Sequence, residues 1–232
     1  MIYGMAHKWG ILNILKGKLG EIMVSKIRTI IIITIVLMMG GCNSIENPEN
    51  QNLNLFEKEG LYGYKTTDGE TVIPAKYILA HEFSEHGIAP VLDVEKGWIY
   101  INKSQQVVIK PYEVNNGYDE FSDGLARFKK EDKIGFFNKK GEVVIPAKFE
   151  YATKFIRGIA AVAKDLEIKE DGELRLPVGG KWGFINKSGK LIVQYKFDNV
   201  IFPFNEEGKA VVVYNGKKVY VNRNGEVLER YK

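Results

Sequence analysis

The chain has 232 residues, of which 45% are hydrophobic and 27% charged, so its composition is that of a globular protein and not of a disordered one. Its formal net charge of +4 comes from residues 1–41, which hold five basic side chains and one acidic side chain. Residues 42–232 hold the other 28 basic and 28 acidic side chains, so this part of the chain carries no net charge. A neutral body lacks the positive field that nucleic-acid binding needs, and we predict no nucleic-acid partner.

Residues 23–41 are typical of a secretory signal, with a charged start, an apolar run from Ile30 to Met39 and two glycines directly before Cys42. The apolar run is shorter than the roughly 20 residues that cross a bilayer. Because a cysteine follows the small pair, the segment resembles a bacterial lipoprotein signal, although Met39 stands where that family usually has leucine. The resemblance implies that Cys42 carries acyl chains such as palmitate and becomes the mature N-terminus. The alternative is an uncleaved apolar anchor.

The signal also sets the expected domain organisation. Residues 1–22 are interpreted as an upstream extension, with translation starting at Met23; the alternative is an unusually long charged region. Residues 42–52 are polar and predict a flexible tether, followed by a folded body from residue 53 to 232. We expect a cell-membrane protein, lipid-anchored at Cys42 and facing outside the cytoplasm. Cys42 is the single cysteine, which excludes an intrachain disulfide.

A repeat organises the body. Equivalent apolar runs lie at residues 63, 99, 135, 183 and 218, so the spacing is 36, 36, 48 and 35 residues, with one insertion before the fourth copy. Each copy has three apolar runs, and glycine turns separate them. Because neighbouring copies must bury each other's apolar faces, the pattern predicts an all-β fold of five three-stranded antiparallel β-meanders in tandem. The array is expected to be an open solenoid or propeller-like, and we favour the open form.

Two further expectations concern the strands of a copy. The period of two places Trp182 and Phe184 on one face of their strand and Ile185 on the other. The last run of a copy is expected to end at Pro74 or Pro146, because proline lacks the N–H that continues a ladder.

The copies resemble the bacterial WG-repeat family. The segments that carry the resemblance are Lys181-Trp182-Gly183-Phe184-Ile185-Asn186 with Gly189, Val144-Ile145-Pro146, and Phe121-Ser122-Asp123-Gly124-Leu125-Ala126. The motif glycine is replaced by Ile99 in the second copy and Val219 in the fifth, which argues against one ligand at every copy. Since functions in this family are mostly undefined, the resemblance implies an architecture and not an activity.

Four aromatic residues at matching repeat positions are candidate ligand contacts: Trp98, Trp182, Tyr64 and Tyr100. They either form the core between copies or remain exposed and stack sugars or peptide side chains. Burial separates the two interpretations, because only an exposed ring has a face free for a ligand.

The insertion, residues 164–180, alternates apolar and polar residues on both sides of Asp171-Gly172, which predicts a hairpin. The repeat does not require this segment, and added loops often carry binding. We therefore predict ligand contacts at Glu167, Lys169, Asp171 and Arg175; the alternative is an extended hairpin without a binding role.

The pair His81 and His86 invites comparison with zinc proteases, but a helical zinc pair is spaced by four residues and this pair by five. We predict an ordinary loop there, no metal and no cofactor. Neither a nucleophile elbow nor a facing carboxylate pair is marked, so we expect no enzyme. The leading hypothesis is a non-catalytic binding module for a protein or a cell-wall polymer. The alternatives are a structural surface spacer and, given a deep cleft with convergent carboxylates, a glycan-active enzyme.

Overall fold

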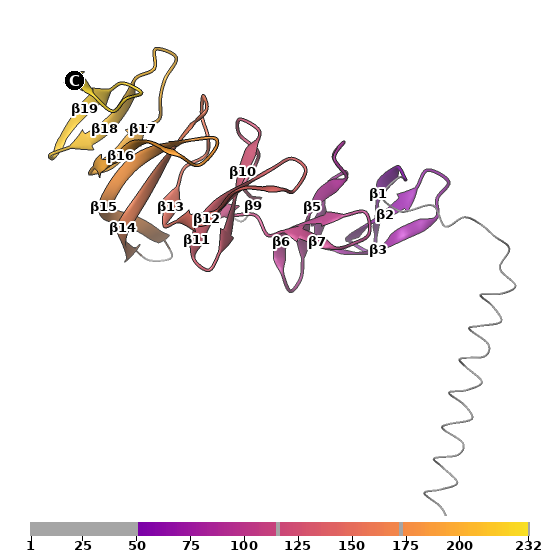
Figure 1. The fold of residues 1–232 in the computed structure, drawn as a ribbon. Helices are drawn as coiled ribbons and strands as arrows, with labels where there is room; N and C mark the ends of the chain where they lie inside the picture. Colours follow the sequence, from indigo (N-terminus) through magenta and orange to yellow (C-terminus); the bar gives the residue numbers. More distant parts are fainter. Residues whose placement is uncertain (1–50, 115–116, 172–173, 232) are drawn as a thin grey trace, which may run out of the picture. The chain divides into compact units, whose positions relative to one another are not determined.

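The computed structural model describes residues 51–114, 117–171 and 174–231. These residues form twenty β-strands and no helix, and the predicted all-β class is confirmed (Figure 1). The first strand begins at Leu53, the residue at which the repeat body is predicted to start. Cys42 and the signal segment lie outside the described residues, so the anchor stays a prediction.

Three antiparallel strands in sequence order make each repeat, and we number the repeats units 1 to 5. The strands are β1 (Leu53–Lys58), β2 (Leu61–Thr66) and β3 (Thr71–Tyr77) in unit 1; β5 (Ile88–Asp93), β6 (Gly97–Asn102) and β7 (Val107–Ile109) in unit 2; β10 (Leu125–Lys130), β11 (Lys133–Asn138) and β12 (Val143–Phe149) in unit 3; β14 (Ile159–Asp171), β15 (Leu174–Asn186) and β16 (Leu191–Phe197) in unit 4; and β18 (Ala210–Tyr214), β19 (Lys217–Val221) and β20 (Val227–Arg230) in unit 5. Throughout the described residues, every sheet contains only strands that are consecutive in sequence. The predicted tandem array of five meanders is therefore confirmed.

Four links join the units, and they are more regular than the sequence indicates. Short strands in the links are β4 (Leu79–Ala80), β8 (Glu113–Val114), β9 (Gly117–Tyr118), β13 (Tyr151–Ala152) and β17 (Asn199–Phe202). Strands β4, β13 and β17 each add an edge to the unit that follows, whereas β8 and β9 pair with each other. We name the links by number: the first spans 78–87, the second 110–124, the third 150–158 and the fourth 198–209.

The hydrophobic core lies between units and not within them. Trp182 and Phe184 of unit 4 pack with Ala210 and Val212 of unit 5. Ile185, on the other face of the same strand, packs with residues of unit 3. The predicted alternation of the two faces is confirmed, and equivalent clusters join units 1 to 2 and 2 to 3. Each inner unit is thus apolar on both faces, which explains why one meander alone is marginal and a stack is stable.

The glycine of the repeat motif has a steric role. A Cβ built on Gly63 would lie 2.5 Å from the carbonyl oxygen of Ile73 and 2.6 Å from the nitrogen of Ala75, and Gly135 is equally crowded. The cause is a bulge in the third strand: Tyr62 pairs with Tyr77 and Tyr64 with Ile73, so three residues face Gly63 alone. Only glycine admits a backbone this close.

The same bulge corrects the prediction that the third run ends at proline. Strand β3 continues through Pro74 to Tyr77, and β12 continues through Pro146 to Phe149. Proline is accommodated because it lies in the bulge on an edge strand, where its missing N–H interrupts no regular ladder.

Units 2 and 5 lack the motif glycine, and their third strands differ accordingly. In unit 5, Val219 pairs directly with Arg230, without the wide bulge. In unit 2, β7 stops at Ile109, and the chain leaves to meet unit 3, where Pro111 bridges to Phe128. The side chain of Ile99 is buried and packs with residues of unit 1.

The predicted hairpin in the insertion is confirmed. Strands β14 and β15 pair without a register shift as far as Asp171 and Leu174. Asp165 and Gly180 keep positive φ angles of 58° and 69°, like the turn residues Glu131 and Asp132 of unit 3. The insertion therefore enters in the middle of a two-residue turn and leaves the repeat on both sides unchanged.

Candidate ligand-binding groove

The four repeat aromatics are core residues. Their exposed fractions are 6% for Trp98, 6% for Trp182, 0% for Tyr64 and 3% for Tyr100. A ring enclosed by its own protein has no free face, so the interpretation of a row of stacking platforms is wrong. The alternative, a core between units, is what the structure shows.

The insertion residues are partly accessible. Glu167 and Lys169 are exposed and lie two residues apart on β14. Asp171 and Arg175 belong to the paired strands, with Asp171 opposite Leu174 and Arg175 opposite Glu170, but their side chains lie outside what the structure describes. The hypothesis that this hairpin contacts a ligand stays a prediction.

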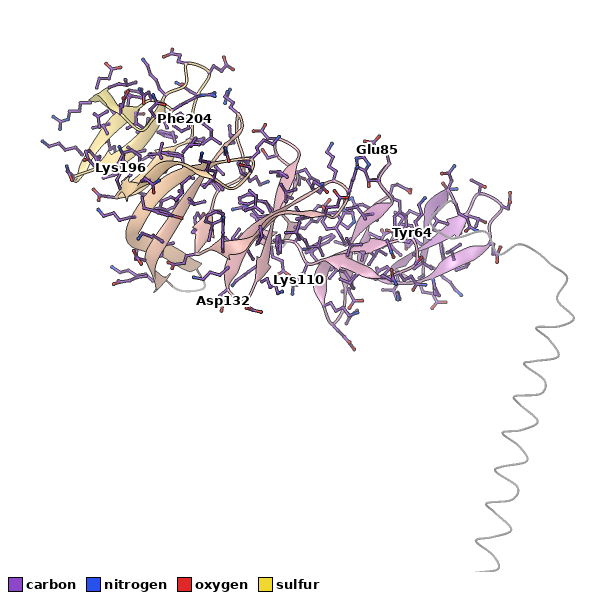
Figure 2. The ribbon with its side chains drawn as sticks, viewed as in Figure 1. Tyr64, Glu85, Lys110, Asp132, Lys196 and Phe204 are labelled. Carbon is purple, nitrogen blue, oxygen red and sulfur yellow. The ribbon has the colours of Figure 1, made fainter. Side chains whose placement is uncertain are left out.

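A groove of about 530 Å³ opens between the first and second links, beside unit 2. It is lined by His81, Glu82, Ser84, Glu85, His86, Ile88, Pro90, Tyr100, Tyr118, Glu120, Phe121 and Lys139. The floor is apolar and aromatic, and Glu85, labelled in Figure 2, belongs to the charged rim contributed by the first link. A concave site with apolar walls and convergent polar side chains is a candidate ligand pocket.

The groove exists because the phenylalanine of the second link, Phe121, which we call the plug of unit 2, packs loosely. Each link sends one phenylalanine against the central ring of the preceding unit. The ring centroids are 4.6 Å apart for Tyr64 and Phe83, 4.7 Å for Phe136 and Phe155, and 4.8 Å for Phe184 and Phe204. The equivalent distance between Tyr100 and Phe121 is 6.0 Å. The second link also differs from the others at its start, because β7 ends at Ile109 and Pro111 bridges to Phe128 of unit 3.

The hydroxyl group of Tyr100 differs from its equivalent in unit 1. The Tyr64 hydroxyl donates a hydrogen bond of 2.6 Å to the carbonyl of His81. The Tyr100 hydroxyl has no hydrogen bond to any of the described residues, yet none of their fully buried side-chain polar atoms lacks a partner. The Tyr100 oxygen is therefore accessible from the groove that the residue lines.

Carboxylates set the electrostatics of the groove. Burial raises the pKa of Tyr100 well above its usual range, and the charges of Asp119 and Glu120 raise it further. Burial and Glu120 also raise the pKa of Tyr118. Glu82, Glu85 and Glu120 are exposed on the rim beside Lys139 and two histidines, and Glu85 Oε1 lies 3.6 Å from Nε2 of His86. The site thus favours a positive group and a donor to the Tyr100 oxygen.

The same place in unit 4 holds a smaller groove of about 180 Å³. Strand register gives the correspondence, because Pro90 faces Tyr100 in unit 2 as Ala161 faces Phe184 in unit 4. The unit 4 groove is lined mainly by apolar residues, with Thr153 and Lys154 where unit 2 has His81 and Glu82. It has neither the size nor the acidic rim of the first.

In unit 3 the equivalent place is filled by Arg127, which faces Phe136 as Pro90 faces Tyr100. Its guanidinium donates from Nε and Nη2 to the carboxylate of Asp119 at 3.0 and 2.8 Å, and from Nη1 to the carbonyl of Ala152 at 2.8 Å. The guanidinium carbon also lies 4.7 Å from the ring centre of Tyr112. Asp119 and Arg127 are 0% and 7% exposed.

Among the contact residues predicted from the sequence, Tyr100 lines this groove, whereas the loop from His81 to His86 is predicted to have no special role. The residues that shape the groove are visible as departures from the repeat: Ile99 replaces the motif glycine, and Glu113 stands where units 1 and 3 have Tyr77 and Phe149. These departures from the repeat pattern are the sequence signal from which the groove could be predicted.

Meanders that pack face to face in sequence order define the chain as a tandem β-repeat protein. The family model described as "WG containing repeat" matches residues 62–95, 98–133, 134–165 and 182–217, more than half of the chain, and the chain belongs to that family. Each match begins at the strand position that Trp182 occupies in unit 4. A comparison with curated proteins gives no match.

Across residues 51–114, 117–171 and 174–231, no helix is long and apolar enough to cross a membrane. The same residues contain no group of three or more His, Cys, Asp or Glu side chains placed to hold a metal ion.

Proposed function

We propose that the chain is a non-catalytic binding module, held at the outer side of the cell membrane through a lipid on Cys42. Its ligand is a segment of a protein or of a cell-wall polymer, bound at the groove between the first and second links. The observation that carries this proposal is the groove itself, about 530 Å³ with an aromatic floor and an acidic rim, at the one described unit whose plug is loose. Several acyl chains, each contributing about 0.8 kcal/mol per buried methylene, are sufficient for stable anchoring.

A substitution that fills the groove tests the binding role. Ser84 is exposed and lines the groove, so Ser84→Trp places a large ring in it. Ser188→Trp is the matched control, because Ser188 is an exposed turn residue of unit 4. The full chain, extracted from membranes in detergent, is incubated with cell-envelope proteins and with cell-wall fragments, and retained ligands are identified. Wild type and Ser188→Trp are expected to retain the same ligand, and Ser84→Trp to lose it.

Two results overturn the binding role. If all three proteins retain the same ligands, the groove is not the site. If none retains a ligand, the chain acts as the structural spacer that the sequence left as an alternative.

Anchoring is tested separately with Cys42→Ser. Cells are labelled with a fatty acid that carries a detectable tag, and membrane and released fractions are compared. The wild-type chain is expected to be labelled and membrane-bound, and the variant unlabelled. Equal labelling of both refutes lipidation at Cys42.

A further inference from the structure

The repeat supplies its own example of what this place in a unit binds. Pro90 in unit 2 and Arg127 in unit 3 occupy the same register position, opposite Tyr100 and Phe136. In unit 3 the arginine side chain bridges two links, because it reaches Asp119 in the second and Ala152 in the third. In unit 2 the residue at this position is a proline, whose short ring leaves the space between the links open as the groove.

The guanidinium of Arg127 uses three kinds of contact. A carboxylate accepts two parallel hydrogen bonds, a link carbonyl accepts a third, and the ring of Tyr112 lies 4.7 Å from the guanidinium carbon. Planar guanidinium groups suit this set better than ammonium groups, since they donate in pairs to carboxylates and stack on aromatic rings. In unit 3, the space between two links is therefore one that a guanidinium group fits.

The open groove of unit 2 also offers carboxylates and an aromatic ring and has no arginine of its own, although His81, and not a carboxylate, stands in the first link where Asp119 stands in the second. Glu82 of the first link and Glu120 of the second link each directly precede the phenylalanine of their link. Glu85 of the first link adds a third carboxylate. Tyr118 supplies an aromatic wall, and the ring of His81 packs edge-on against it with the two ring centroids 5.6 Å apart. The accessible Tyr100 hydroxyl, in a residue that is 3% exposed, supplies an acceptor at the floor.

We propose that the groove beside Pro90 binds the guanidinium of an arginine side chain in the ligand, inserted between the first and second links as Arg127 is inserted in unit 3. The inference rests on the proposed binding function and names the chemistry that the groove recognises. It favours an arginine-containing protein segment over a neutral cell-wall glycan.

The test uses three capped tripeptides as probes, Gly-Arg-Gly, Gly-Lys-Gly and Gly-citrulline-Gly. Citrulline has the shape of arginine without its charge. Each is titrated into the full chain in detergent, and binding is followed by NMR line shifts of the protein's tyrosine rings. The arginine peptide is expected to bind at least about tenfold more tightly than the citrulline peptide and more tightly than the lysine peptide, with an affinity that falls as salt is added.

Variants of the chain locate the effect. Pro90→Arg is expected to remove binding of the arginine peptide, because the chain then fills its own groove, while Pro90→Ala keeps it and controls for the loss of the proline. Glu120→Gln is expected to weaken binding about threefold to tenfold. Glu95→Gln removes one exposed carboxylate from the β5–β6 turn of the same unit, outside the groove, and is expected to leave binding unchanged.

The outcomes separate the two proposals. Equal binding of the arginine and citrulline peptides, or equal loss with Glu120→Gln and Glu95→Gln, overturns the arginine inference. If no peptide binds while Ser84→Trp still abolishes capture of the native ligand, the arginine inference fails and the binding function stands. If Ser84→Trp also changes nothing, both fail.

Discussion

Removing the charge of Arg127 is expected to destabilise the chain strongly. The guanidinium makes three hydrogen bonds, and its partner Asp119 is fully buried, so Arg127→Met leaves a carboxylate without its main donor. Breaking a buried pair from one side costs about 3 to 5 kcal/mol. Lys154 offsets part of this loss, because its Nζ lies 3.5 Å from Asp119 Oδ1. We expect a loss of about 3 kcal/mol in the free energy of unfolding.

A double-mutant cycle isolates the pair. Asp119→Asn alone leaves a buried guanidinium and is expected to cost about 2 to 3 kcal/mol, and the double variant about 3 kcal/mol in total, which is well below the sum of the single costs. Urea unfolding of the full chain in detergent, followed by tryptophan fluorescence, measures each variant. The matched control is Arg157→Met, since Arg157 and Glu206 form an exposed pair at 3.2 Å and such pairs contribute about 0 to 1 kcal/mol.

Two results would refute this reasoning. If the costs of Arg127→Met and Asp119→Asn add without coupling, the pair does not act as a unit. If Arg127→Met costs no more than Arg157→Met, the place between the links does not depend on a guanidinium, and the comparison with the open groove of unit 2 loses its basis.

Three further predictions concern pH, the motif glycine and the turns. Burial tends to raise the pKa of Asp119, but the hydrogen bonds and charge of Arg127 outweigh it, so the pKa lies below its usual range. The difference in free energy of unfolding between wild type and Asp119→Asn is therefore constant above about pH 5 and shrinks below about pH 4. Urea midpoints measured across that pH range test this. Gly135→Ala would bring a Cβ to 2.6 Å from the carbonyl oxygen of Ile145 and is expected to lower the free energy of unfolding by about 2 kcal/mol, whereas a cost under about 0.5 kcal/mol would mean that the bulge can move. Asn186→Ala removes the Oδ1 atom that accepts from the backbone nitrogens of Ser188 and Lys190, at an expected cost of about 1 kcal/mol in the same assay, and Asn186→Asp should retain most of it.

The repeat itself could be predicted because its signals are local. A glycine turn between two apolar runs specifies a hairpin, and five copies in phase specify a stack. The two faces of the strand through Trp182, Phe184 and Ile185 follow from the period of two alone. These features need no knowledge of what each unit touches.

The bulge and the burial of the aromatics could not be read in the same way. Pro74 and Pro146 predict the end of a strand by their chemistry, but each lies in a bulge that only the facing glycine makes possible. Tyr100 fits a core or a stacking platform until unit 3 is placed against it, and Trp98 until Tyr118 of the second link is placed against it. The pairing of two strands within one unit decides the first question, and contacts with neighbouring units and links decide the second.

The groove is a consequence of degeneracy within a regular array. Every inner unit leaves a space between two links, and the side chain opposite the central ring decides, together with the residues of the links, how much of that space stays open. Arg127 fills the space in unit 3, small apolar groups around Ala161 reduce it in unit 4, and Pro90 leaves it open in unit 2. Unit 2 also has Ile99 in place of the motif glycine, its strand β7 ends at Ile109, and the second link then runs to unit 3. The proposed ligand arginine therefore needs no separate binding domain, because unit 2 has the same place between two links and no side chain of its own that fills it.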